Sequence, residues 1–184
     1  MLPFSLKKEY WDAGLAEYQA SGTEILIYPY DTEAPGNFGT IDLGDNNNST
    51  SELVDQILNG ISAEDLAMVG NMELQDTGEV DEEGNPIFAR DVNGDTGISA
   101  GIKSALQSII NQPRLLPIHR SVTGQGNNAT FEVCGFVGIH IVDVHLTGNP
   151  KWISVVPHVV TVRQAVINPS APRSRLVYAL SLTR

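Results

Sequence analysis

The most regular apolar pattern in the chain lies between residues 98 and 110. Its apolar positions recur every three or four residues, which places them on one face of a helix. They are Ile98, Ile102, Ala105, Leu106, Ile109 and Ile110. Asp95 or Thr96 can cap the start of this helix, and Pro113 lies just beyond its end. The pattern therefore predicts an amphipathic helix over 98–110.

Two shorter helices are predicted upstream from their capping residues. Ser49 and Glu52 have the spacing of a capping box, and Gly60 supplies a stop after the apolar face that follows. Ser62 and Asp65 repeat the start signal. A short helix is also predicted over residues 4–20, where aromatic and apolar residues recur.

Strand patterns dominate the rest of the chain. The longest, residues 129–146, is apolar on both faces, which is typical of a central strand that is covered above and below. Pro157 predicts an edge or a bulge in a strand over 152–162. The other expected strands are 24–29, 40–43, 71–75, 86–89, 114–119 and 176–182.

These elements predict one α+β domain over residues 1–184. Antiparallel strands follow a helix-rich part, so we expect a mainly antiparallel sheet, as a sandwich or a partly open barrel. About three helices are expected in the N-terminal two-thirds of the chain.

Charge is unevenly distributed along the chain, whose formal net charge is −11. Residues 31–95 hold sixteen acidic residues and one basic residue, Arg90, whereas Glu132 and Asp143 are the only acids after residue 95. Such an acidic body argues against nucleic acid as a partner, because phosphates would be repelled. It is either a solvated face, or a surface for cations or for a basic partner.

Calcium binding is one candidate function. Asp91, Asn93 and Asp95 place oxygen ligands at alternate positions, as the start of an EF-hand loop does. The match ends at Thr96, where glycine is expected, and at Ile102, where a bidentate glutamate is expected. The alternative is a turn in which Asp95 caps the following helix.

Hydrolysis is a second candidate function. Asp143 and His145 are two residues apart in a strand, so they share a face and could form an acid–imidazole pair. No Gly-x-Ser-x-Gly motif accompanies them. The single cysteine, Cys134, lies in an apolar run, which favours a core position over a nucleophile and leaves no partner for a disulfide within the chain.

Several short blocks, in this order, resemble one family. They are Gly36–Gly39, Asp95–Lys103, Gln112–Pro117, Gly126–Asn128, Phe136–Gly148 and Leu182–Arg184. Together they resemble the C-terminal extracytoplasmic domain of bacterial TadE/TadG-like Flp (tight-adherence) pilus-assembly proteins.

The resemblance implies a non-enzymatic domain of the cell envelope without a cofactor. Its expected partners are other pilus-assembly or envelope proteins. Members of that family usually begin with one transmembrane helix, so contact with the membrane is expected only through an N-terminal anchor that precedes residue 1. Within the Gly36–Gly39 block, Asn37 and Phe38 are candidates for partner contact, with a core position as the alternative for Phe38.

Overall fold

The computed structural model describes residues 1–28, 37–44, 48–162 and 177–179. The helices are α1 (Lys8–Ser21), α2 (Thr50–Asn59), α3 (Ala63–Met68) and α4 (Lys103–Ser108), with 3-10 turns η1 (Gly70–Met72), η2 (Ala100–Ile102) and η3 (Gly126–Asn128). The strands are β1 (Phe4–Lys7), β2 (Ile25–Tyr28), β3 (Phe38–Ile41), β4 (Gln75–Val80), β5 (Pro86–Asp95), β6 (Pro113–Thr123), β7 (Ala129–His145), β8 (Trp152–Pro157), β9 (Val160–Val162) and β10 (Val177–Ala179). The predicted α+β class is confirmed.

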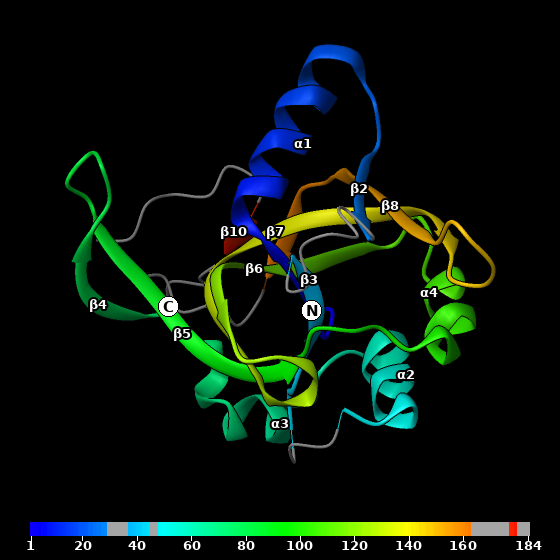
Figure 1. The fold of residues 1–184 in the computed structure, drawn as a ribbon, viewed down its shortest axis with the longest axis horizontal. Coiled ribbons are helices and arrows are strands. Elements are labelled where there is room, and N and C mark those ends of the chain that lie inside the picture. Colours follow the sequence, from blue (N-terminus) through cyan, green and yellow to red (C-terminus); the bar gives the residue numbers. More distant parts are fainter. Residues whose placement is uncertain (29–36, 45–47, 163–176, 180–184) are drawn as a thin grey trace, which may run out of the picture.

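The large sheet has eight strands in the order β2-β8-β7-β6-β1-β3-β5-β4. An additional pairing between β5 and β7 closes β1, β3, β5, β7 and β6 into a ring, so these five strands form a small barrel (Figure 1). Every pairing in this sheet is antiparallel except that of β1 with β6. Of the two predicted architectures, the barrel is the one observed.

The predicted central strand is β7. Its first residues pair with β5, its second half pairs with β8, and β6 runs along most of its length. A register shift between Ile141 and Asp143 changes the alternation of side chains. Val144 is therefore buried in the same core cluster as Ile139 and Ile141, although an unbroken alternation along the strand would put it on the opposite face.

Two hydrophobic clusters stabilise the fold. The larger one contains residues of α1, α2 and α4 and of strands β1, β2 and β6–β8, including Trp11, Ile57 and Leu106. The smaller one is centred on Phe131 and Val133 of β7, with α3 and η1 residues against it. In Figure 1, α1 projects from one side of the sheet, while α2 and α3 lie below the barrel.

The predicted starts of two helices are correct, and in both a serine side chain caps the first turn. The hydroxyl oxygen of Ser49 accepts a hydrogen bond from the backbone N–H of Glu52, and Ser62 does the same for Asp65. Gly60 caps the end of α2 with φ 87°, a conformation that favours glycine. The capped starts of α2 and α3 are therefore confirmed.

Several predicted elements have other bounds in the structure, and β5, predicted over 86–89, continues to Asp95. Residues 4–7 form β1, so the first helix begins only at Lys8, because pairing with β3 and β6 outweighs local helical preference. The predicted helix 98–110 is reduced to η2 and α4, and Ser99, not Asp95 or Thr96, caps its start. The strand predicted at 71–75 begins at Gln75.

Near the C-terminus, β8 ends at Pro157 and β9 begins at Val160 after two intervening residues, as expected for a proline that interrupts a ladder. The strand predicted over 176–182 is represented by β10, and its remaining residues lie outside the described ranges. Within those ranges, no helix has both the length and the apolar composition needed to cross a membrane.

Candidate functional site

The interior of the barrel is filled, so it cannot serve as a binding site. Ser5 and His119 both have an exposed fraction of 0%, and the Ser5 hydroxyl lies 2.8 Å from Nδ1 of His119. The ring of Phe131 packs edge-on against His119, with their centroids 5.0 Å apart. This serine–histidine pair is therefore sealed from substrates.

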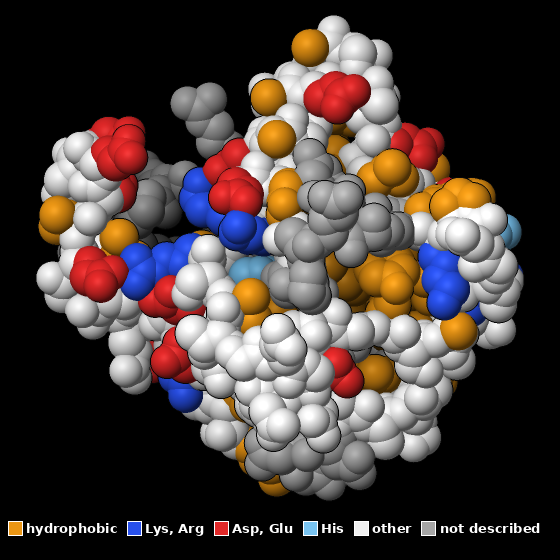
Figure 2. Space-filling view, in the orientation of Figure 1, with side chains coloured by type: hydrophobic (Ala, Val, Ile, Leu, Met, Phe, Trp, Pro, Cys, Tyr) orange, Lys and Arg blue, Asp and Glu red, His pale blue; other side chains and the backbone are white. Residues whose placement is uncertain are grey.

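The most prominent outer feature is the hairpin of β4 and β5, which stands away from the barrel (Figure 1). All six residues of β4 are exposed. Figure 2 shows basic and acidic side chains gathered along the seam between this hairpin and the barrel. The hairpin and the seam together form a charged, accessible surface.

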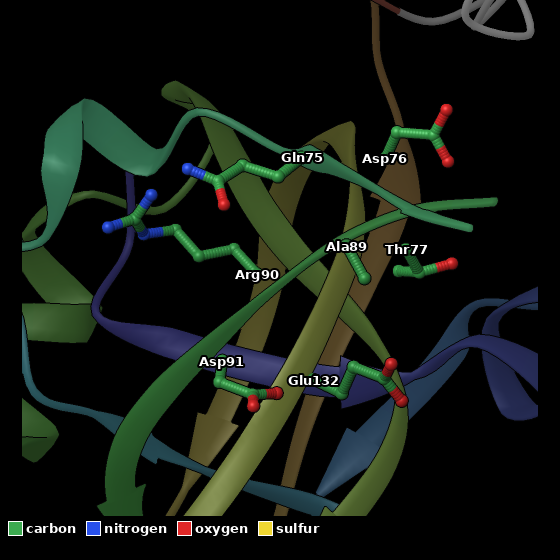
Figure 3. Close-up of a pocket in the computed structure, with 7 residues that line it drawn as sticks. All are labelled: Gln75, Asp76, Thr77, Ala89, Arg90, Asp91 and Glu132. Carbon is green, nitrogen blue, oxygen red and sulfur yellow. The ribbon is translucent and has the colours of Figure 1, made fainter. Parts of the chain in front are cut away.

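A cleft of about 360 Å³ lies at the base of the hairpin. Its lining comes from β4, β5 and β7, and consists of Gln75, Asp76, Thr77, Ala89, Arg90, Asp91 and Glu132 (Figure 3). We call this cavity the hairpin cleft. Its walls are mainly polar and charged, unlike the apolar pockets that hold most small organic ligands.

Two acidic side chains lie next to each other on the floor of the hairpin cleft. Asp91 and Glu132 are direct cross-strand partners on β5 and β7, and they lie side by side in Figure 3. Like charges at such positions repel each other. Within the described part of the chain, the carboxylate of Asp91 has no hydrogen bond or ion pair. The floor therefore carries one negative charge that remains available.

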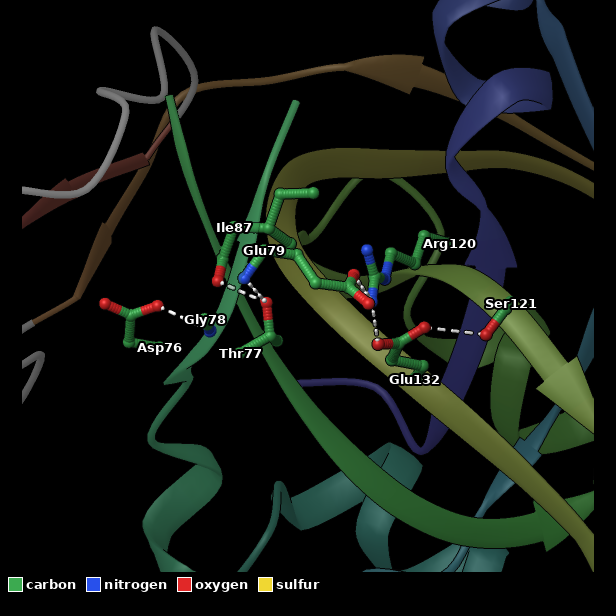
Figure 4. A network of polar contacts seen from close by, with 8 residues as sticks. All are labelled: Asp76, Thr77, Gly78, Glu79, Ile87, Arg120, Ser121 and Glu132. Carbon is green, nitrogen blue, oxygen red and sulfur yellow. Dashed lines mark hydrogen bonds and ion pairs between the residues drawn. The ribbon is translucent and has the colours of Figure 1, made fainter. Parts of the chain in front are cut away.

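Glu132 is already bound from the other side. The Arg120 guanidinium on β6 forms ion pairs with both Glu132 and Glu79, and the Ser121 hydroxyl donates to Glu132 at 2.7 Å (Figure 4). Hydrogen bonding to Arg120 lowers the pKa of Glu132 below its ordinary value, and the two glutamates raise the pKa of Arg120. Arg120 thereby ties the hairpin, through Glu79, to the barrel.

A second basic residue borders the hairpin cleft on the opposite side. A guanidinium N–H of Arg90 donates to the carbonyl of Glu73 at 3.2 Å. The same guanidinium lies so close to Gly70 that a Cβ atom there would be 2.2 Å from it. Arg90 is held against the backbone of η1, so it does not neutralise Asp91.

The predicted calcium ligands are not arranged as a turn. Asp91, Asn93 and Asp95 lie on β5, which corrects the turn that the sequence suggested. The Asn93 amide donates to Asp42 at 3.0 Å, and Asp95 accepts from the backbone N–H of Gly97 at 2.9 Å. Asp95 lines a different cavity, of about 280 Å³.

No cluster of three or more His, Cys, Asp or Glu side chains able to hold a metal ion occurs in the described ranges. Calcium binding by Asp91, Asn93 and Asp95 stays a prediction.

The candidate partner residues Asn37 and Phe38 are buried. Phe38 is 5% exposed; its ring stacks on Phe4 and packs at a tilt against Tyr28, with ring centroids 5.6 and 5.5 Å away. The Asn37 amide donates to the Tyr10 hydroxyl at 2.8 Å. Phe38 therefore has the core position that was the alternative to partner contact.

The candidate hydrolytic pair is not joined by a hydrogen bond. The carboxylate of Asp143 accepts from the Val144 backbone N–H at 2.8 Å and from the indole N–H of Trp152. The His145 ring stacks on Trp152 at 4.2 Å between centroids. Asp143 thus orients the indole and leaves the imidazole without its expected acid partner.

No protein-family model, curated protein or solved structure matches the chain. The resemblance to TadE/TadG-like proteins therefore stays a prediction.

The residues that form the hairpin cleft were largely missed by sequence reasoning. Glu132 carried the one available signal, because it is an acid in the mainly apolar first half of β7. Arg120 and Glu79 are 41 positions apart, and no local pattern links them.

Proposed function

We propose that this chain is a non-catalytic, protein-binding domain that docks a basic partner segment at the hairpin cleft. The observation that carries the proposal is the position of Asp91, which has an open cavity above it and Glu132 directly opposite. A lysine or arginine side chain entering the cavity would remove the repulsion between these two carboxylates.

The shape of β4 supports binding through side chains and not through strand addition. The ladder between β4 and β5 is interrupted between Asp76 and Val80, and Gly78 adopts φ 76°. Bulges and charged side chains at a sheet edge oppose pairing with another strand. A partner is therefore expected to insert a side chain next to β4 without extending the sheet.

The remaining reactive groups support a role without chemistry. The hydroxyl of Ser5 is sealed inside the barrel, and Asp143 is engaged by Trp152. Burial raises the pKa of the Cys134 thiol to about 11, which leaves little of the nucleophilic thiolate at neutral pH. None of these groups combines a nucleophile, a base and open access.

The biological setting is proposed from the sequence blocks that resemble TadE/TadG-like Flp pilus-assembly proteins. In that setting the domain is extracytoplasmic, is tethered by an N-terminal membrane anchor, and binds other pilus-assembly or envelope proteins. The hairpin cleft supplies a contact surface for such a partner.

Site-specific photocrosslinking in the native cell tests this proposal. A photoreactive amino acid at Thr77, in the hairpin cleft, is expected to capture one dominant partner with a basic segment, identified by mass spectrometry. The same amino acid at Gln107, an exposed residue of α4, is the positional control.

Charge reversal supplies the matched control. Asp91→Lys should abolish the crosslink from Thr77, because the inserted cation would repel a basic partner, whereas Glu17→Lys makes the same charge change at an exposed site on α1 and should preserve it. The proposal is wrong if both substitutions behave alike, or if Thr77 captures nothing that Gln107 does not.

A further inference from the structure

Two histidine rings stack on each other where the chain leaves the large sheet. His140 lies on β7, and His158 lies between the end of β8 and the start of β9. Their ring centroids are 3.6 Å apart and the rings are inclined by 23°. The backbone N–H of His158 donates to the carbonyl of Gly138 at 2.9 Å, so the turn is held to β7 by this bond and by the stacked rings.

We propose that His140 and His158 form an acid-sensitive latch that holds the β8–β9 turn against β7. While the His140 ring is neutral, it stacks on the ring of His158 and the turn is closed. A proton on His140 would place a positive charge on a ring whose buried Nε2 atom has no acceptor, so the ring would leave the stack to reach water and the turn would be released.

The described cross-strand neighbours of His140 supply no negative charge to offset its protonation. Its cross-strand neighbours are Pro113 on β6 and Val156 on β8, and β8 carries no ionisable side chain from Trp152 to Pro157. The charged residue beside Pro113 is Arg114, whose guanidinium donates to the Gln112 side chain and to a backbone carbonyl.

The other elements near the latch also lack acids. β9 has no ionisable residue, and β10, which contacts β7, has no Asp or Glu in its sequence. On β7 itself, the nearest carboxylate in sequence is Asp143, which is engaged by Trp152. Among the described residues of these strands, no free carboxylate is placed to stabilise a proton on His140.

The environment of the His140 ring disfavours a positive charge on it. Its Nε2 atom is buried and has no hydrogen-bond partner within the described residues. Burial, together with the charge of His158, lowers the pKa of His140 below its ordinary value of 6.5. A group whose folded pKa is lowered contributes stability above the unfolded pKa, and this contribution is lost as the pH falls below about 6.5.

The latch borders the face that β9 and β10 cover. β9 contacts β6, β10 contacts β7, and these two short strands pair in parallel. Release of the turn would loosen β9 and uncover that face of β6 and β7 at acidic pH. This inference is independent of the hairpin cleft.

Hydrogen exchange read by mass spectrometry tests the latch. After correction for the intrinsic effect of pH, amides of residues 158–162 should exchange at least tenfold faster at pH 5.5 than at pH 7.5, while residues 131–141 of β7 stay protected. His140→Phe and His158→Phe, two independent variants, keep a stacking ring that cannot be charged, so the acid response should disappear in each variant that folds.

His145→Phe is the matched control, because it removes a histidine that stacks on Trp152 and not on His158. It should retain the full acid response. The latch is disproved if the wild-type segment shows no acid response, if β7 loses protection at the same time, or if the folded phenylalanine variants respond as the wild type does.

Discussion

The ring of Phe131 occupies the space that a side chain at Gly39 would need. A Cβ atom on Gly39 would lie 2.5 Å from the Cζ atom of Phe131 and 2.4 Å from the backbone carbonyl oxygen of Asp95. Across the same ring, a Cβ on Gly94 would lie 2.2 Å from the carbonyl of Thr40. The barrel closes around Phe131 because β3 and β5 carry glycine at these two positions.

Substitution of Gly39 tests this packing. Gly39→Ala should lower the free energy of unfolding by about 1–3 kcal/mol or more, because a backbone carbonyl cannot move aside as a flexible side chain can. Gly135→Ala on β7 is the control, since no atom lies within 4 Å of its added Cβ. Urea denaturation measures both, and equal effects would contradict the packing argument.

The ion pairs of Arg120 should make stability depend on pH. Arg120→Met should cost about 1.5–3 kcal/mol at neutral pH, because a partly buried charged hydrogen bond is lost. Since Arg120 lowers the pKa of Glu132, its contribution is present above the ordinary value of 4.5 and is lost as the pH falls through the folded value. The difference between wild type and Arg120→Met should therefore shrink on acidification below about pH 4.5.

The control for Arg120 is an exposed ion pair. The side chains of Lys8 and Asp12 are 58% and 52% exposed, compared with 29% and 20% for Arg120 and Glu132. Lys8→Met should change the unfolding free energy by about 0.5 kcal/mol or less. A larger effect for Lys8 than for Arg120 in urea denaturation would refute the role assigned to Arg120.

Cys134 should be poorly reactive in the folded protein. With its pKa raised to about 11 by burial, only about one thiol in a thousand is ionised at pH 8, and the thiolate is the form that reacts. Iodoacetamide labelling should be slow in the native state and accelerate in 8 M urea. Because Cys134 is the single cysteine, the unfolded chain provides its own reference rate. Equal rates would exclude a protected thiol.

Calcium is not expected to stabilise the protein. Two of the three predicted ligands already have partners in the protein, because Asn93 donates to Asp42 and Asp95 accepts from the backbone N–H of Gly97. A ligand at one hundred times its Kd raises stability by about 2.7 kcal/mol, which a thermal melt detects easily. An increase in Tm with millimolar calcium that Asp91→Asn removes would reinstate the calcium site.

Part of the fold could be predicted from the sequence because its causes are local. The caps at Ser49 and Ser62 depend on a residue three positions away, and both starts are confirmed. The apolar residues on both faces of β7 predicted a central strand, since apolar side chains on both faces of a strand need cover. These features depend on near neighbours that the sequence displays directly.

Only the tertiary structure decided the rest. The closing of the barrel, the change of face at the bulge before Asp143 and the pairing of Asp91 with Glu132 depend on the register between distant strands. A shift of one residue in that register would turn Asp91 away from the hairpin cleft, and no spacing within β5 specifies it. Local pattern therefore determined the elements, and long-range pairing determined which side chains meet.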